Sequence, residues 1–167
     1  MKKLRRFISV LETVLEYFAC SCLVLMTVII TYQIFMRYFF SATPGWSEEL
    51  ALLLMVWFAF IGMAIGVRRR SHLSIEFLVA RLSDTAQAYV AILNELLILV
   101  FGAILFIFGV NMMITSNMST MAALGISSSF LYLMVPVSGF LMMVYTIDNL
   151  IAAVSDTFFR KDIWRHK

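Results

Sequence analysis

The sequence predicts an all-α integral membrane protein with four transmembrane helices, and three observations favour this fold class. Of the 167 residues, 62% are hydrophobic and only 14% are charged, whereas a soluble domain has about 25% charged residues. The mean hydropathy is +0.94. Four apolar stretches are each long enough to cross a bilayer, which takes roughly 20 helical residues. A lone strand cannot satisfy its backbone polar groups in lipid, and the alternating pattern of a membrane β-barrel is missing from the sequence.

The four predicted helices follow one another without an internal repeat or a low-complexity linker. The first runs from about Tyr17 to Phe40 and the second from Trp46 to Val67. The third runs from about Thr85 to Met113 and the fourth from about Ser129 to Val154. We therefore expect residues 1–167 to form a single membrane domain.

The first predicted helix follows a basic start, MKKLRRF, that resembles the beginning of a signal peptide. Glu12 and Glu16 interrupt the apolar run that a signal peptide needs. The start is therefore expected to be retained. Arg37 lies at the far end of this helix, and the short connection 41–45 to the second helix predicts an antiparallel hairpin.

The second predicted helix opens with the sequence WSEE, residues 46–49, ahead of eighteen uncharged residues. Ser47 is expected to cap the helix, and two glutamates in the first turn suit the positive end of the helix dipole. On a helical wheel, Glu48 continues into a stripe that narrows to Gly62 and Gly66, a spacing that permits close helix approach. Glu49 continues into a bulkier face that includes Trp57.

The hairpin would bring Arg37 to the depth of Glu48, so an ion pair between these two side chains is expected. Glu49 is then left for another partner. The alternative is that both glutamates are simply solvated at a helix start.

The connection between the second and third helices is basic, with Arg68, Arg69, Arg70 and His72. Residues 73–82 carry apolar side chains on one broad side and charged ones on the other, which predicts a short helix in the inner membrane interface.

The third and fourth predicted helices contain acidic residues at similar depth. Glu95 and Asp148 both fall in the cytoplasmic half, near the level of the three arginines. They could form an ion or proton site, but an interfacial network with those arginines is favoured. Pro136, followed by Gly139, predicts a kink in the fourth helix.

The basic residues predict the orientation of the chain. Twelve of the thirteen lie on one side, in both termini and in the connection after the second helix. The N-terminus, the C-terminus and this connection are therefore expected in the cytoplasm. The same residues would attract anionic membrane lipid, so no nucleic-acid partner is needed to explain the net charge of +3.

Signatures of catalysis are missing from the sequence. The two histidines, His72 and His166, both fall on the predicted cytoplasmic side, where they cannot hold a haem inside the bundle. The sequence contains no HExxH, GxSxG or Walker motif. We expect no enzyme activity, no cofactor and no metal site.

The residues together resemble a known family. The stretch FMRYFFSATPGWSEELALLLMVWFAFIGMAIGVRRRSHLSIEFL contains an RY pair, W-x-E-E-L, W-x-x-F-x-G, a basic run and H-L-x-I. This combination, with Val135 and Pro136 in the fourth helix, closely resembles the small membrane subunit of tripartite ATP-independent periplasmic (TRAP) transporters, the DctQ-like family. One departure is Glu76, where the family is expected to have aspartate.

The resemblance implies a function that periodicity alone does not. The chain would be a stator in a bacterial or archaeal inner membrane, bound to a large membrane subunit that carries the substrate and sodium sites. A periplasmic binding protein would deliver an organic acid such as a C4-dicarboxylate, a sialic acid or a sugar acid. The alternative is an independent four-helix transporter or a membrane assembly factor.

Two groups of residues are the candidate site residues on this interpretation. The expected partner interface comprises Arg37, Trp46, Glu48, Glu49, Trp57, Gly62 and Gly66. The expected inner network comprises Arg68, Arg69, Arg70, His72, Glu95 and Asp148.

Overall fold

The computed structural model describes the backbone of residues 2–69 and 84–165, and the side chains of 10–69, 86–87 and 89–151. Its main helices are α1 (Lys2–Phe40), α2 (Gly45–Arg68), α4 (Asp84–Thr115) and α6 (Met134–Arg165). A 3₁₀ turn, η2 (Ser116–Met118), and one short helical turn, α5 (Ser129–Tyr132), lie between α4 and α6. The predicted interfacial helix 73–82 falls outside the described residues.

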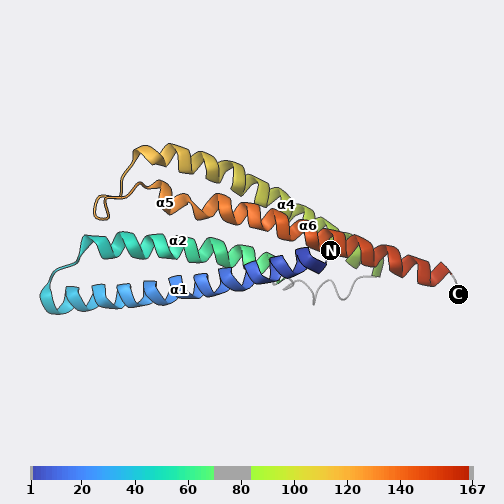
Figure 1. Ribbon diagram of the computed structural model, residues 1–167, viewed down its shortest axis with the longest axis horizontal. Coiled ribbons are helices and arrows are strands. Elements are labelled where there is room, and N and C mark those ends of the chain that lie inside the picture. Colours follow the sequence, from blue (N-terminus) through green and yellow to red (C-terminus); the bar gives the residue numbers. More distant parts are fainter. Residues whose placement is uncertain (1, 70–83, 166–167) are drawn as a thin grey trace.

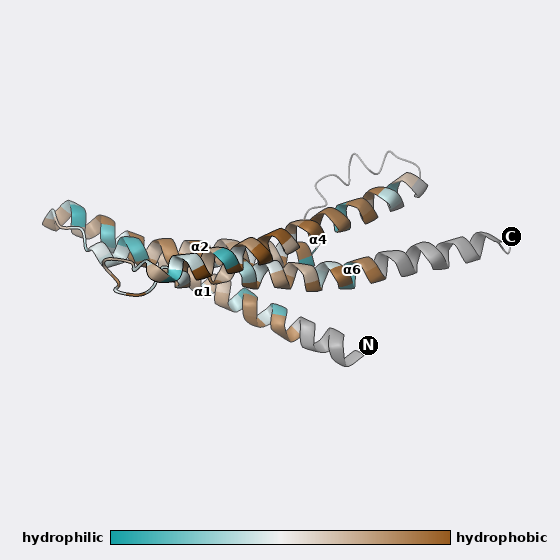
Figure 2. Cartoon of the chain, turned by 90° about the horizontal axis from the view of Figure 1, so that it is seen from above, coloured by the Kyte–Doolittle hydropathy of each residue, from teal (hydrophilic) through white to brown (hydrophobic). Residues whose placement is uncertain are grey.

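Four of these segments are long and apolar enough to cross a membrane: Val10–Phe40, Gly45–Arg68, Tyr89–Met118 and Ser129–Ile151. The predicted all-α fold with four membrane helices is confirmed. Figure 2 shows how strongly hydrophobic residues dominate α4, whose span has the highest mean hydropathy, 2.6.

The first helix differs from its predicted start at about Tyr17, because α1 already begins at Lys2. The polar residues before Val10 do not stop the helix. Helical hydrogen bonds are satisfied within the segment, so the helix can continue from the membrane into water. Hydropathy therefore marks where the chain enters lipid and says little about where the helix begins.

The helices form two antiparallel hairpins, α1 with α2 and α4 with α6 (Figure 1). Helix α2 also packs against α6, so α2 and α6 are the inner members of the bundle and α1 and α4 the outer ones. Connections 41–44 and 116–128 lie at the same end of the bundle (Figure 1). We call this the outer end and the opposite one the inner end, following the orientation predicted above.

Helices α4 and α6 pack closely because glycines lie at their contact. A Cβ atom added to Gly139 would lie 2.6 Å from the backbone nitrogen of Phe106 and 2.8 Å from the carbonyl oxygen of Gly102. One added to Gly109 would lie 2.7 Å from the nitrogen of Pro136. Lipid is as apolar as a leucine side chain, so membrane helices associate through such close backbone approach.

The stripe on α2 does not play this role within the chain. A Cβ atom added to Gly62 or Gly66 would meet nothing within 4 Å. Within the described residues, no helix makes the close approach that this spacing permits. The GxxxG spacing is present, but the face that carries it is open.

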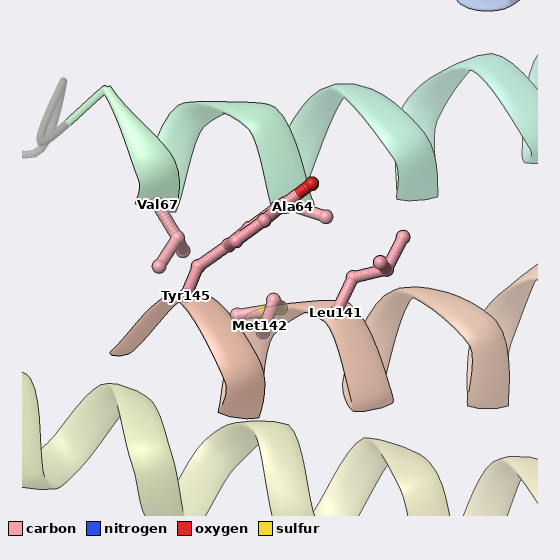
Figure 3. Packing of buried hydrophobic residues seen from close by; sticks show 5 residues of the cluster. All are labelled: Ala64, Val67, Leu141, Met142 and Tyr145. Atoms are coloured by element: carbon pink, nitrogen blue, oxygen red, sulfur yellow. The ribbon is translucent and has the colours of Figure 1, made fainter. Parts of the chain in front are cut away.

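The core joins the two hairpins near the inner end. Figure 3 shows Tyr145 extending from α6 across the interface toward Ala64, with Val67, Leu141 and Met142 around it. The side chain of Tyr145 is fully buried.

A second cluster joins α1 to α2 through Ala19, Ile61 and Ile65. Together the two clusters make α2 the helix that links both hairpins.

The fourth predicted span is interrupted near its outer end. Helix α5 ends at Tyr132 and α6 begins at Met134, while Leu133 between them keeps right-handed helical angles. Pro136 has no N–H to donate to the carbonyl of Tyr132, which explains a break at this point. The proline therefore lies in the first turn of α6, where a missing N–H is tolerated.

Candidate functional site

The turn between α1 and α2 positions the WSEE residues at the outer end. Ser41 adopts a positive φ of 51° and lets the chain reverse direction, and α2 begins at Gly45. Ser47 is fully buried, and its hydroxyl donates a hydrogen bond to the carbonyl oxygen of Pro44 at 2.6 Å. The expectation that Ser47 is the N-cap is therefore wrong, because α2 already begins at Gly45 and Pro44 occupies the cap position.

Glu49 holds the outer connection onto α2. Its carboxylate accepts hydrogen bonds from the backbone N–H of Ala123, at 3.1 and 3.0 Å to the two oxygens, and from that of Leu124 at 2.9 Å. Charge-assisted bonds of this kind are stronger than neutral ones. The partner that the sequence left open for Glu49 is thus a backbone turn more than seventy residues away.

The turn that Glu49 holds belongs to a compact loop, residues 119–128. Thr120 and Ser127 form an antiparallel bridge, and the N–H of Met121 donates to the carbonyl of Ile126 at 2.8 Å. Gly125 has a φ of +67°, a conformation that glycine adopts without a steric penalty. The loop is therefore shaped by its own hydrogen bonds as well as by Glu49.

The expected Arg37–Glu48 pair does not form in the described part of the chain. The ion pairs there involve other residues, and both Arg37 and Glu48 have exposed side chains. Antiparallel neighbours at similar depth need not point toward each other, since a side chain's direction depends on its place around the helix. The hairpin was predicted correctly, and the pairing across it was not.

An apolar groove opens beside Glu48, between α1 and α2. Its volume is about 570 Å³, and its walls include Met26 and Ile30 of α1 with Leu52 and Met55 of α2. Glu48 and Ala123 also line it. We refer to this feature as the α1/α2 groove.

The two tryptophans among the candidate residues have different surroundings. Trp46 is 41% exposed, and its ring stacks on that of Tyr32 with ring centroids 6.0 Å apart. The indole N–H of Trp57 donates to the carbonyl oxygen of Phe130 at 2.9 Å, and its ring lies 6.0 Å from that of Phe18. Trp57 therefore ties α2 to α5, while Trp46 is available at the surface of this chain.

An ion-pair cluster links three helices at the inner end. Arg68 lies 2.8 Å from Asp148 of α6 and 3.7 Å from Glu12 of α1. Arg69 lies 2.6 Å from Glu16 and 3.6 Å from Glu12. The end of α2 is thereby held to both of its neighbours.

Part of this cluster is predictable from the sequence, which places Asp148 near the arginines but indicates no partner for Glu12 or Glu16. Their spacing of four residues, which puts both on one helix face, was the available signal. Glu95 is 7% exposed and lies buried in α4, and Arg70 and His72 fall outside the residues whose side chains are described.

Tyr145 and Asn149 support the same cluster from α6. The guanidinium of Arg68 lies over the Tyr145 ring, 5.9 Å from its centroid. The amide of Asn149 donates to the carbonyl oxygen of Val67 at 3.4 Å, near the C-terminal end of α2. The inner cluster therefore holds α1, α2 and α6 together, and Glu49 holds the loop 119–128 onto α2.

The sequence is similar to proteins of a known transporter family. Residues 26–156 match the family described as tripartite ATP-independent periplasmic transporters, DctQ component. The chain is 28% identical over 150 residues to the sialic acid TRAP transporter small permease protein SiaQ of Vibrio cholerae. The matched region covers 90% of this chain and 85% of SiaQ.

A second relative is much longer. The sialic acid TRAP transporter permease protein SiaT of Haemophilus influenzae is 28% identical over 138 residues. The match covers 83% of this chain but 22% of SiaT. In that relative, a segment similar to this chain is part of one polypeptide with a much larger remainder.

Proposed function

Because the chain belongs to the DctQ component family of tripartite ATP-independent periplasmic transporters, we propose that it acts as the stator of such a transporter. It is a small membrane subunit that crosses the bacterial inner membrane several times, and the family is a transporter component without enzyme activity. Small subunits of these transporters pair with a large permease.

The match to SiaT carries the proposal. The matched region is 22% of SiaT, so a region like this chain is physically joined to the rest of a permease protein there. Where the region is a separate chain, noncovalent contacts must replace the peptide link. This chain therefore binds a large membrane subunit and holds it in place while that subunit moves its substrate.

The geometry suits a static role. The inner ends of α1, α2 and α6 are joined by the cluster around Arg68, and the outer loop is held to α2 by Glu49. Both hairpins are thus fixed relative to each other at their two ends. A rigid chain of this kind gives the large subunit a fixed support while that subunit moves its substrate.

We further propose that the outer loop 119–128 helps to dock the periplasmic binding protein. On the predicted orientation it faces the periplasm, and its shape is fixed before a partner arrives, which lowers the entropic cost of binding. The transported solute is proposed to be an organic acid, and the uptake to be driven by sodium. Sialic acid is the first candidate because the names of SiaQ and SiaT contain it; C4-dicarboxylates and sugar acids are the others.

Uptake in cells tests this function. Cells that lack their own transporter for the solute would express the large subunit and the binding protein with or without this chain. Accumulation of labelled sialic acid or C4-dicarboxylate is expected only when all three proteins and a sodium gradient are present. Equal uptake without this chain would contradict a stator role, and uptake by this chain alone would identify an independent transporter.

A further inference from the structure

We infer that the α1/α2 groove receives a transmembrane helix of the large subunit, and that this helix carries a lysine or arginine side chain that reaches Glu48. The inference rests on the proposed function, because it names the surface through which the stator would bind its partner.

The walls of the groove determine what can fill it. Leu52 is 44% exposed and Met55 is 47% exposed, and Met26 and Ile30 face them from α1. These side chains offer no hydrogen bonds except weak ones to sulfur, so the occupant is apolar along most of its length. Methionine side chains adapt to irregular shapes, which suits a surface that packs against another chain.

Glu48 adds a charge requirement at the outer mouth of the groove. Its carboxylate is exposed and forms no ion pair within the described residues, whereas the neighbouring Glu49 is already occupied by the outer loop. A carboxylate at the edge of hydrocarbon is costly unless it is paired or hydrated. The groove is therefore complementary to an apolar helix with a cationic side chain near its outer end.

The small residues along the open face favour a helix over a lipid. Below the groove, the same face of α2 continues through Ala59, Gly62 and Gly66, and space remains open above both glycines. From Glu48 to Gly66 the face extends about 27 Å at 1.5 Å per residue, close to the whole hydrocarbon thickness of about 30 Å. Small residues with open space above them let a second helix backbone approach closely, which is how membrane helices associate.

Photo-crosslinking in the assembled complex tests this assignment. A photoreactive amino acid would replace Met55, in the groove, or Ile107, which is 59% exposed on α4 at the far side of the bundle. The chain would be purified with the large subunit in the same cells before and after irradiation. We expect Met55 to yield an adduct with the mass of the two subunits, in clear excess over Ile107.

Glu48→Gln supplies the charge test in the same complex. Removing the carboxylate is expected to lower the Met55 adduct by about tenfold, equivalent to about 1.4 kcal/mol. Because the Glu48 side chain is exposed and unpaired in the described chain, this change should leave the fold intact.

The outcomes separate the groove from the proposed function. The large subunit could co-purify while Met55 yields only lipid adducts, or no more adduct than Ile107. In that case the large subunit does not bind in the groove, and the proposed function stands. If Glu48→Gln leaves the yield of the Met55 adduct unchanged, the partner helix does not carry a cationic side chain that pairs with Glu48. Failure of the large subunit to co-purify at all would contradict the proposed function and the groove together.

Discussion

The Glu49 carboxylate accepts hydrogen bonds from two consecutive backbone N–H groups, those of Ala123 and Leu124. In Glu49→Gln the amide NH₂ would face one of these donors and the charge would be lost. Hydrogen bonds to charged groups contribute about 1.5 to 3 kcal/mol each. We predict faster hydrogen exchange across residues 119–128, measured by mass spectrometry, together with weaker uptake.

Glu48→Gln is the matched control for this change, since it makes the same substitution one residue earlier. It should leave exchange in the loop unchanged, because Glu48 makes no bond to Ala123 or Leu124. Equal exchange in the two variants would show that Glu49 does not hold the loop.

Asp148 provides the second prediction at this scale. Its carboxylate lies 2.8 Å from Arg68, and both side chains are about a quarter exposed or less. Breaking a fully buried pair costs about 3 to 5 kcal/mol, and partial exposure lowers this to about 1 to 3 kcal/mol. Asp148→Asn should therefore lower the thermal unfolding temperature of the purified protein, whereas Glu48→Gln should not. An unchanged unfolding temperature would mean that Arg68 is satisfied by Glu12 alone.

Individual contacts were the hardest feature to predict. The loop 119–128 contains no charge, so nothing in its side chains identified it as the partner of Glu49. Almost every residue has a backbone N–H group, and only the fold determines which two of them lie within reach of Glu49. The pair of Arg68 with Asp148 was accessible, because opposite charges at matching depth in neighbouring helices have few other partners.

At the scale of helices, the glycines of α4 and α6 offer a direct test. A Cβ atom at Gly139 would collide with the backbone at Phe106 and Gly102, so Gly139→Ala forces the two helices apart. Overpacking of this kind costs about 1 to 3 kcal/mol. The variant should unfold at a lower temperature and yield less folded protein after extraction.

Gly66→Ala is the matched control, because a Cβ atom there meets nothing within 4 Å in the described chain. Its thermal stability should equal or exceed that of the unchanged protein, since alanine favours helix more than glycine does. If Gly66→Ala destabilised the isolated chain as much as Gly139→Ala does, the space above Gly66 would not be open.

Helices were predictable and their contact faces were not. Hydropathy located all four spans because a bilayer imposes a minimum apolar length on each. The GxxxG spacing at Gly62 and Gly66 predicts a close helix approach, yet the glycines at helix contacts within the described chain are Gly102, Gly109 and Gly139. Small residues permit close approach, but their spacing does not tell which helix approaches or from which chain.

For the molecule as a whole, orientation follows from the charge distribution. A phosphatase reporter inserted within residues 116–128 should be active, because that enzyme works in the periplasm, and reporters at both termini should be inactive. Twelve of thirteen basic residues on the other side make this the expected arrangement. If instead a reporter that works only in the cytoplasm is active within residues 116–128, the chain has the opposite orientation.

Native mass spectrometry of the affinity-purified chain tests the central claim that it is a stator bound to a large permease. The chain has a mass of 19.1 kDa. Purified from cells that also express its large subunit, it should give a complex with the summed mass of both proteins, which separates into the two chains on activation. A spectrum that contains this chain only alone, or only with copies of itself, would contradict the account.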